Sequence, residues 1–217
     1  MTVVQLKPSA SASHQGGARV RALAERLDDA ALVGAIQRGD RAAAGELFDR
    51  HAPRVRRVLV RVLGSDPDIA DLLQEVFVHA LRDLPKLSDP NALGGWLNAI
   101  AVNLARRTIR KRTRWRWLRP TPPEELSAVP VDGHDENGSE ELVAVYRILG
   151  AMQADERIAF ALRFIEGMEL KEVAAACDVS LATIKRRLAR AESYFRERAK
   201  TDPALQERIA KSEGRQK

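Results

Sequence analysis

Apolar residues recur every three or four positions along two stretches of this chain, and a proline-rich acidic segment separates the two. The first stretch covers about residues 29–117, and the second covers residues 140–199. This spacing places apolar side chains on one face of an α-helix, whereas a half-buried strand alternates them at every second residue. No such alternation appears in the first stretch. The sequence therefore predicts an all-α protein with two small helical domains.

Capping residues mark where helices of the first domain should begin and end. Asp40 precedes an apolar-periodic run that Gly64 follows, and Ser65 or Asp66 precedes Pro67 at the start of the next run. A short polar side chain accepts an unpaired N–H of the first helical turn, and proline at the first helical position lacks the N–H that would be unpaired there. We expect one helix between Asp40 and Gly64 and another that starts at Pro67.

The segment between the two stretches, "PTPPEELSAVPVDGHDENGSE", contains four prolines and a cluster of acidic residues. Such a composition favours an extended, acidic linker. Residues 1–28 begin with a Ser-, Ala- and Gly-rich stretch, and the sequence after Lys200 is charged. We therefore divide the chain into a leader (1–28), a first domain (29–117), a linker (118–139), a second domain (140–199) and a charged tail (200–217), of which the tail could be helical from Pro203.

The composition favours a polyanionic partner and gives no sign of a cofactor. The chain carries 36 Lys and Arg residues against 30 Asp and Glu residues, a net charge of +6. A single cysteine, Cys177, excludes an intramolecular disulfide, and four scattered histidines form no cluster at zinc-ligand spacing. No run of about 20 apolar residues and no signal-peptide core occurs. We expect a cytoplasmic protein without a metal or cofactor.

The segment "MELKEVAAACDVSLATIKRRLARA" has the pattern of a helix-turn-helix. Ser180 can cap its second helix, with Leu181, Ile184 and Leu188 facing inward. Six residues are then expected to face outward near the front of that helix: Thr183, Lys185, Arg186, Arg187, Ala189 and Arg190. A recognition helix presents such residues to the major groove, where Lys and Arg bind guanine edges and phosphates.

The segment from Trp96 to Trp117, "WLNAIAVNLARRTIRKRTRWRW", has one apolar and one basic stripe. Its inward stripe consists of Leu97, Ile100, Ala101, Leu104 and Thr108, and its other stripe consists of Asn103, Arg107, Arg110 and Arg114. The second half of the segment contains no acidic residue. Asparagine can bind a base edge, and arginines neutralise phosphates or stack on bases, so this helix is expected to touch nucleic acid.

Acidic residues share one face of the helix predicted after Pro67. Asp68, Asp71 and Glu75 are spaced by three and four positions, opposite the apolar stripe. They are expected to meet basic residues on a partner.

Taken together, "DIADLLQEVFVHAL", "WLNAIAVNLARRTIRKR", the linker and the helix-turn-helix resemble the extracytoplasmic-function (ECF) sigma factors of bacterial RNA polymerase. The resemblance covers about residues 30–198, in the order and spacing of that family. It implies a transcription initiation factor that makes no bonds itself. Its partners would be core RNA polymerase, promoter DNA as duplex and as melted single strand, and, as commonly in the family, an anti-sigma factor that can hold it at the inner membrane face.

The resemblance also implies a role for particular residues. The segment expected to dock on the clamp coiled coil of the largest polymerase subunit contains Asp68, Asp71, Leu72, Gln74 and Glu75. The residues expected to read the minus-ten element as a single strand are Trp96, Asn103, Arg106, Arg107 and Arg110, although a tryptophan at a helix start, such as Trp96, more often packs in the core than stacks on DNA. The residues expected to read the minus-thirty-five element as duplex are Thr183, Lys185, Arg186 and Arg190.

Three other functions remain open at the level of sequence. A dimeric helix-turn-helix regulator that acts without polymerase would explain residues 169–195 alone. A DNA-cleaving recombinase needs a nucleophile, and Tyr146 and Tyr194 both fall within predicted helices. A membrane-surface helix at 115–119 would lie between two soluble helical blocks. We predict no catalytic residue.

Overall fold

A computed structural model of the protein describes residues 28–118 and 136–206. Residues 1–27 of the predicted leader, most of the predicted linker and the end of the tail lie outside these residues. Within them every regular element is a helix and no strand occurs. The prediction of an all-α fold is confirmed.

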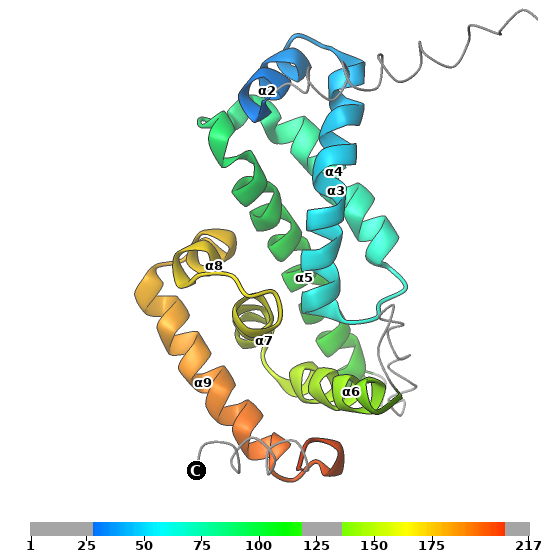
Figure 1. The fold of residues 1–217 in the computed structure, drawn as a ribbon, viewed down its shortest axis with the longest axis vertical. Coiled ribbons are helices and arrows are strands. Elements are labelled where there is room, and N and C mark those ends of the chain that lie inside the picture. Colours follow the sequence, from blue (N-terminus) through cyan, green and yellow to red (C-terminus); the bar gives the residue numbers. More distant parts are fainter. Residues whose placement is uncertain (1–27, 119–135, 207–217) are drawn as a thin grey trace, which may run out of the picture.

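The helices follow one another in two groups (Figure 1). The first group contains α2 (Asp29–Gln37), α3 (Arg41–Leu63), α4 (Ile69–Asp83) and α5 (Leu93–Leu118), with the short turns η1 (Leu84–Lys86) and η2 (Pro90–Ala92) between α4 and α5. The second group contains α6 (Glu136–Ala151), α7 (Ala154–Phe160), the π-helical turn η3 (Ala161–Ile165), α8 (Leu170–Cys177) and α9 (Leu181–Ala199). Helix therefore extends into both ends of the predicted linker.

Most predicted helix boundaries agree with the structure, and one is wrong. The side chain of Asp40 accepts the backbone N–H of Ala42 at 2.9 Å, and Gly64 ends α3 with a φ of 78°. Helix α4 begins two residues later than expected, because its N-cap is Asp68. Pro67 instead lies in a turn that the Asp66 carboxylate closes by accepting the backbone N–H of Asp68 at 2.9 Å.

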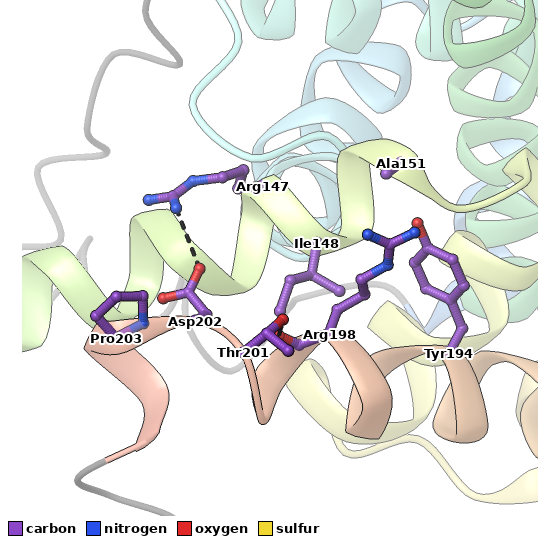
Figure 2. Close-up of a pocket in the computed structure, with 8 residues that line it drawn as sticks. All are labelled: Arg147, Ile148, Ala151, Tyr194, Arg198, Thr201, Asp202 and Pro203. Atoms are coloured by element: carbon purple, nitrogen blue, oxygen red, sulfur yellow. Dashed lines mark hydrogen bonds and ion pairs between the residues drawn. The ribbon is translucent and has the colours of Figure 1, made fainter.

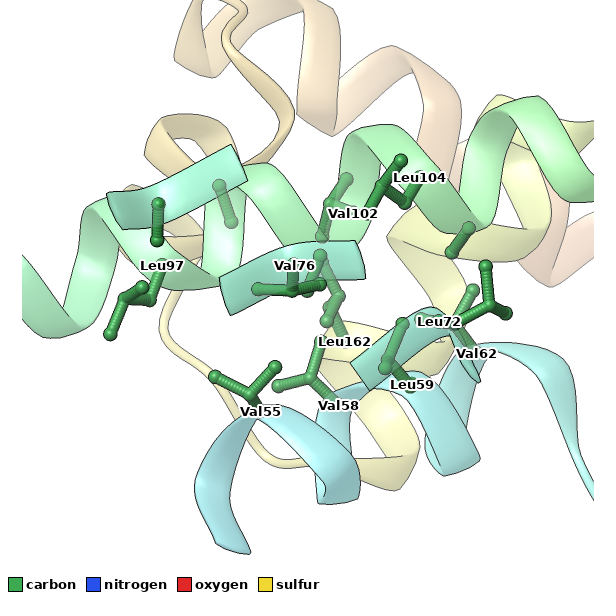
Figure 3. Close-up of a cluster of buried hydrophobic side chains, with 14 of the residues drawn as sticks. Val55, Val58, Leu59, Val62, Leu72, Val76, Leu97, Val102, Leu104 and Leu162 are labelled. Carbon is green, nitrogen blue, oxygen red and sulfur yellow. The ribbon is translucent and has the colours of Figure 1, made fainter. Parts of the chain in front are cut away.

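The two groups of helices share one hydrophobic core. A single cluster of buried apolar side chains draws residues from α2, α3, α4 and α5 and also from α7, η3, α8 and α9. Figure 3 shows Leu162 of η3 in the same cluster as Val58 and Leu59 of α3. Helices α7 and α8 lie beside α5 (Figure 1). The sequence predicted two domains but not that they would pack against each other.

The second group also caps the carboxyl end of α3. The last carbonyls of a helix have no partner within that helix. Arg157 of α7 donates to the carbonyls of Val62 at 2.9 Å and Leu63 at 3.0 Å. The Tyr146 hydroxyl donates to the Val60 carbonyl at 3.3 Å. These contacts fix the second group on the end of α3.

A smaller apolar cluster holds α6 against α9 and the start of the tail. The rings of Phe160 and Phe195 stack at 4.9 Å, and Leu205 of the tail is buried there. Residues 203–206 are helical, as expected from Pro203. Beside this cluster is a cavity of about 370 Å³, where Arg147 donates to Asp202 at 3.1 Å (Figure 2). The described part of the tail is therefore packed against the second group.

Leu162→Ala tests whether the halves fold as one unit. Truncating this fully buried side chain should lower the free energy of unfolding by about 2–5 kcal/mol, because it leaves a cavity between the two groups. Urea unfolding should be followed by tryptophan fluorescence, which reports on α5, and by circular dichroism. Both signals should shift together.

Leu181→Ala, at a side chain that is 37% exposed, is the control and should lower the free energy of unfolding by under about 1 kcal/mol. A fluorescence transition that Leu162→Ala leaves unchanged would mean that the halves unfold independently.

Candidate nucleic-acid and partner interfaces

The outer face of α4 presents most of the predicted docking residues to solvent. Asp68, Asp71, Gln74 and Glu75 are exposed. Leu72 is only 8% exposed and packs in the core. Most of its side chain therefore supports the helix that carries the acids.

Two apolar side chains extend this face beyond the residues chosen from sequence. Val78 is 65% exposed and Leu81 is 39% exposed. They follow Asp71 and Gln74 at spacings of three and four, so all four share one side of α4. The signal was present in the sequence, because both residues fall outside the buried stripe of the helix. The outer face of α4 is therefore acidic toward its amino end and apolar toward its carboxyl end.

A groove of about 490 Å³ lies between the exposed faces of α4 and α5. Its α4 wall contributes Asp68, Asp71, Leu72 and Glu75, and its α5 wall contributes Leu104, Arg107, Thr108, Lys111, Arg112 and Trp115. One wall is thus acidic and the other basic, so the docking and nucleic-acid surfaces predicted from sequence meet along this groove.

Arg112 ties the amino end of α4 to α5. Its guanidinium donates to both carboxylate oxygens of Asp66 and, at 2.8 Å, to Asp68. Burial alone would raise the pKa of Asp66, but the hydrogen bonds from Arg112 and from the Asp68 backbone N–H outweigh it, with help from the charge of Arg112. The pKa of Asp66 therefore lies below its ordinary value. Arg112 serves the fold in this arrangement.

Of the five residues predicted for the inward stripe of α5, three are buried and two, Ile100 and Thr108, are half-buried. Leu97, Ala101 and Leu104 are at most 5% exposed. Three further residues that the sequence stripe did not include are also buried: Val102, Ala105 and Ile109. Trp96 is half-buried and packs against the core, so the packing role is the one seen here. The backbone of the final "RWRW" continues the helix to Leu118.

The predicted reading residues of α5 lie on the remaining polar strip. Asn103, Arg107 and Arg110 are exposed, whereas the side chain of Arg106 is only 15% exposed. Arg106 donates to the Asn103 amide oxygen. The four residues therefore lie together on one helix, and Arg106 orients the amide of Asn103.

Asp155 of α7 meets arginines from both groups of helices. It accepts from Arg106 at 2.8 Å and from Arg110 at 3.0 Å, and Arg187 of α9 lies 3.5 Å away. Burial alone would raise the pKa of Asp155, but these arginines outweigh it, so the pKa lies below its ordinary value. Sequence reasoning missed this residue, because only the packing of α7 on α5 brings it to the arginines.

The helix-turn-helix forms as predicted, with two corrections. Ser180 caps α9 by accepting the backbone N–H of Thr183 at 3.2 Å. Thr183 is half-buried, and three other predicted reading residues are exposed: Lys185, Arg186 and Arg190. Leu181 was expected to face inward, but it is 37% exposed because it lies at the very start of the helix. Arg187 was expected to face outward, but it is turned toward Asp155.

Two potential nucleophiles of the second group, Tyr146 and Cys177, are buried. Burial raises the pKa of Tyr146, whose hydroxyl is occupied by α3 carbonyls. Burial likewise raises the pKa of Cys177 to about 11. Among residues 28–118 and 136–206, no group of His, Cys, Asp and Glu side chains is placed to hold a metal ion. None of the described helices is both long and apolar enough to cross a membrane.

Two family models match this chain. The model of sigma-70 region 2 matches residues 47–115, and the model of sigma-70 region 4 matches residues 142–193. The first match contains α4, most of α5 and the groove between them. The second contains the helix-turn-helix.

Similar proteins extend these matches over most of the chain. The ECF RNA polymerase sigma-E factor of Escherichia coli K12 is 31% identical, over 78% of this chain and 93% of its own length. The protein of the same name in Haemophilus influenzae is 30% identical, over 80% of this chain and 96% of its own length.

Two solved structures have a similar fold. One is CnrH in complex with the cytosolic domain of CnrY, with a TM-score of 0.55, 24% identity and coverage of 79% of this chain and 96% of that chain. The other is the sigma factor RpoE in complex with the anti-sigma factor NepR from Bartonella quintana, with a TM-score of 0.56, 23% identity and coverage of 73% and 97%.

Asp66→Asn tests the tie between α4 and α5. At neutral pH it should lower the free energy of unfolding by about 1–3 kcal/mol, because it weakens the charge-assisted hydrogen bonds that the buried Asp66 carboxylate accepts from the partly exposed Arg112. The pKa of Asp66 lies below 3.8 in the folded state, so its contribution is complete well above that pH and is lost as the pH falls through the lowered value. The difference from the unmodified protein, measured by urea unfolding, should therefore shrink in acid.

Asp49→Asn is the matched control, because Asp49 is exposed on α3. It should change the free energy of unfolding by under about 0.5 kcal/mol. An Asp66→Asn difference that stayed constant from neutral pH to well below the ordinary pKa of aspartate would contradict the role given to its charge.

Proposed function

The chain belongs to the extracytoplasmic-function sigma factors of bacterial RNA polymerase, and from that premise we propose which of its surfaces meet polymerase and which meet DNA. A sigma factor binds core RNA polymerase and directs it to promoters, so this protein is a transcription initiation factor. We assign α2 to α5 to region 2 and α6 to α9 to region 4. The bond-making chemistry belongs to the polymerase, and the place of action is the cytoplasm.

The outer face of α4 is the proposed docking surface for the clamp coiled coil of the largest polymerase subunit. The observation that carries this is a single helix face with exposed acids at one end and exposed apolar residues at the other. Asp68, Asp71 and Glu75 can pair with basic side chains, while Val78 and Leu81 supply apolar surface that a solvent-facing helix would not otherwise present.

The polar strip of α5 is the proposed reader of the melted minus-ten element. Asn103 carries the donors and acceptor that a base edge needs, and Arg106, Arg107 and Arg110 carry charge for the phosphates. An unpaired strand exposes its base edges and stacking faces, so a single helix can bind both bases and backbone. The part of Trp96 is to support the amino end of this helix from the core.

The front of α9 is the proposed reader of the minus-thirty-five element as duplex. Lys185, Arg186 and Arg190 are exposed there, and Thr183 lies at the capped start of the helix. A capped recognition helix with a basic front fits the major groove. A dimeric regulator that acts without polymerase would use the same helix. It would leave the region 2 match and the acidic face of α4 without a role, so we do not favour it.

An anti-sigma factor is a further proposed partner. The solved structure of RpoE with NepR carries such a partner by its title, and this chain has that fold. Sequestration of this protein at the inner membrane face by such a factor is part of the same proposal.

Run-off transcription tests the function as a whole. Core RNA polymerase plus this protein should produce transcripts from a subset of a random promoter library, and those promoters should share two separated elements. Core polymerase alone should not select them. Failure of the protein to associate with core polymerase would overturn the assignment.

Asp71→Lys tests the docking surface. The reversed charge should weaken binding to core polymerase by about tenfold or more, because it places a cation among the basic groups expected on the clamp. Asp49→Lys makes the same charge change on an exposed site of α3 and should leave binding within about twofold. Equal losses in the two variants, measured by fluorescence anisotropy with labelled protein, would move the docking surface elsewhere.

Arg186→Ala tests the duplex reader. It should reduce transcription that depends on the upstream element by about tenfold while leaving the affinity for core polymerase unchanged, since one base or phosphate contact is worth about 1–3 kcal/mol. Arg196→Ala removes an exposed arginine far along the same helix and is the control. A loss of polymerase binding in Arg186→Ala, with the upstream element still used, would contradict the assignment.

A further inference from the structure

The strand-reading strip proposed on α5 is covered along one edge by the second group of helices. Asp155 accepts from Arg106 and Arg110 at 2.8 and 3.0 Å. The Cys177 carbonyl, at the carboxyl end of α8, also accepts from Arg106 at 3.4 Å. A carboxylate and the negative end of a helix therefore occupy donors that a DNA strand would need.

The cluster holds more positive charge than its carboxylate can satisfy. Arg187 adds a third guanidinium, whose Nη2 faces Asp155. Its Nη1 is buried without a hydrogen-bond partner in the described part of the protein. The side chains of Arg106 and Arg187 are only 15% and 21% exposed, so water screens them weakly. A phosphodiester of DNA offers anionic oxygens of the same kind as the Asp155 carboxylate. Phosphate and Asp155 are therefore competitors for the same arginines.

The position of Asp155 in α7 does not by itself explain these contacts. Both Asp155 and its neighbour Glu156 lie in the first turn of α7, where an acidic side chain interacts favourably with the helix dipole. It is Asp155 that forms ion pairs with arginines of α5 and α9. Glu156 therefore provides the helix-terminal effect without the contact across the two groups.

We propose that Asp155 is an intramolecular latch that, in the free protein, holds region 4 over the strand-reading strip of α5. The latch must leave Arg106 and Arg110 before α5 can bind an opened promoter strand. This inference rests on the proposed role of α5. The Arg157 and Tyr146 contacts to α3 and the shared core hold the same closed arrangement. Loss of Asp155 therefore removes the latch, while these other contacts keep the protein folded.

The matched pair Asp155→Asn and Glu156→Gln tests the latch in the full-length free protein. Each variant removes one negative charge from the same turn of α7, so general attraction for DNA changes equally. The probe is a short fluorescent single-stranded DNA of mixed sequence, and the readout is its anisotropy. Asp155→Asn should bind about tenfold more tightly than the unmodified protein, and Glu156→Gln should stay within about twofold. Amide hydrogen exchange in α7 should also become faster in Asp155→Asn alone.

Equal DNA affinities of the two variants would overturn the latch. Arg110→Ala added to Asp155→Asn should abolish the gain in affinity, because Arg110 is one of the donors released. If the gain survives that second change, the DNA lies elsewhere and both the latch and the assigned role of α5 fail. If Asp155→Asn brings no gain while Arg110→Ala weakens minus-ten use by the assembled holoenzyme, the latch fails and the role of α5 stands.

The assembled holoenzyme supplies the last arm of the test. With core polymerase bound, both elements of the promoter must be read at once, so the latch is open in any case. Asp155→Asn holoenzyme should then transcribe within about twofold of the unmodified holoenzyme. A gain there as large as the gain in the free protein would overturn the latch, because it would mean that Asp155 repels DNA in the open arrangement as well.

Discussion

The burial of α5 on two adjoining sides is the constraint on which the rest of the structure depends. One side carries Leu97, Ala101 and Leu104, and Val102, Ala105 and Ile109 widen the buried arc toward the edge where Arg106 meets Asp155. Only a narrow polar strip is left. The residues proposed to read DNA, the groove beside α4 and the contact with α7 are therefore neighbours on a single helix.

The basic residues of α5 are consequently divided among different tasks. Arg112 holds the amino end of α4 through Asp66, and Arg106 and Arg110 are held by Asp155. Arg107 lines the groove beside α4. In a sequence these arginines form one charged run with one apparent purpose. In the folded chain Arg106, Arg110 and Arg112 are directed by carboxylates within their reach, so this part of the charge stabilises the protein, and the proposed latch at Asp155 keeps Arg106 and Arg110 from DNA.

Local signals explain why the helices and several site residues could be predicted. Asp40, Gly64 and Ser180 act within one turn of their own helices, where a cap depends only on neighbouring backbone groups. The start of α4 was predicted wrongly for a related reason. Pro67 is compatible with both a turn and a first helical residue. The Asp66 carboxylate favours the turn, and it is held by Arg112 of α5, 46 positions later in the chain.

The sequence by itself determined the helical fold, the order of its elements, the buried stripe of each long helix and the exposed acidic and basic faces, because all of these follow from spacing along one helix. Its resemblance to sigma factors, carried by the same segments, identified the family. Only the tertiary structure decided that the two halves share a core, that Arg187 turns inward, and that Asp155 reaches Arg106 and Arg110. The ion pairs of Asp155 join residues 32 to 49 positions apart in the chain, and the shared core joins residues still farther apart. Their geometry is set by how helices pack against one another, which the periodicity of a single helix does not contain.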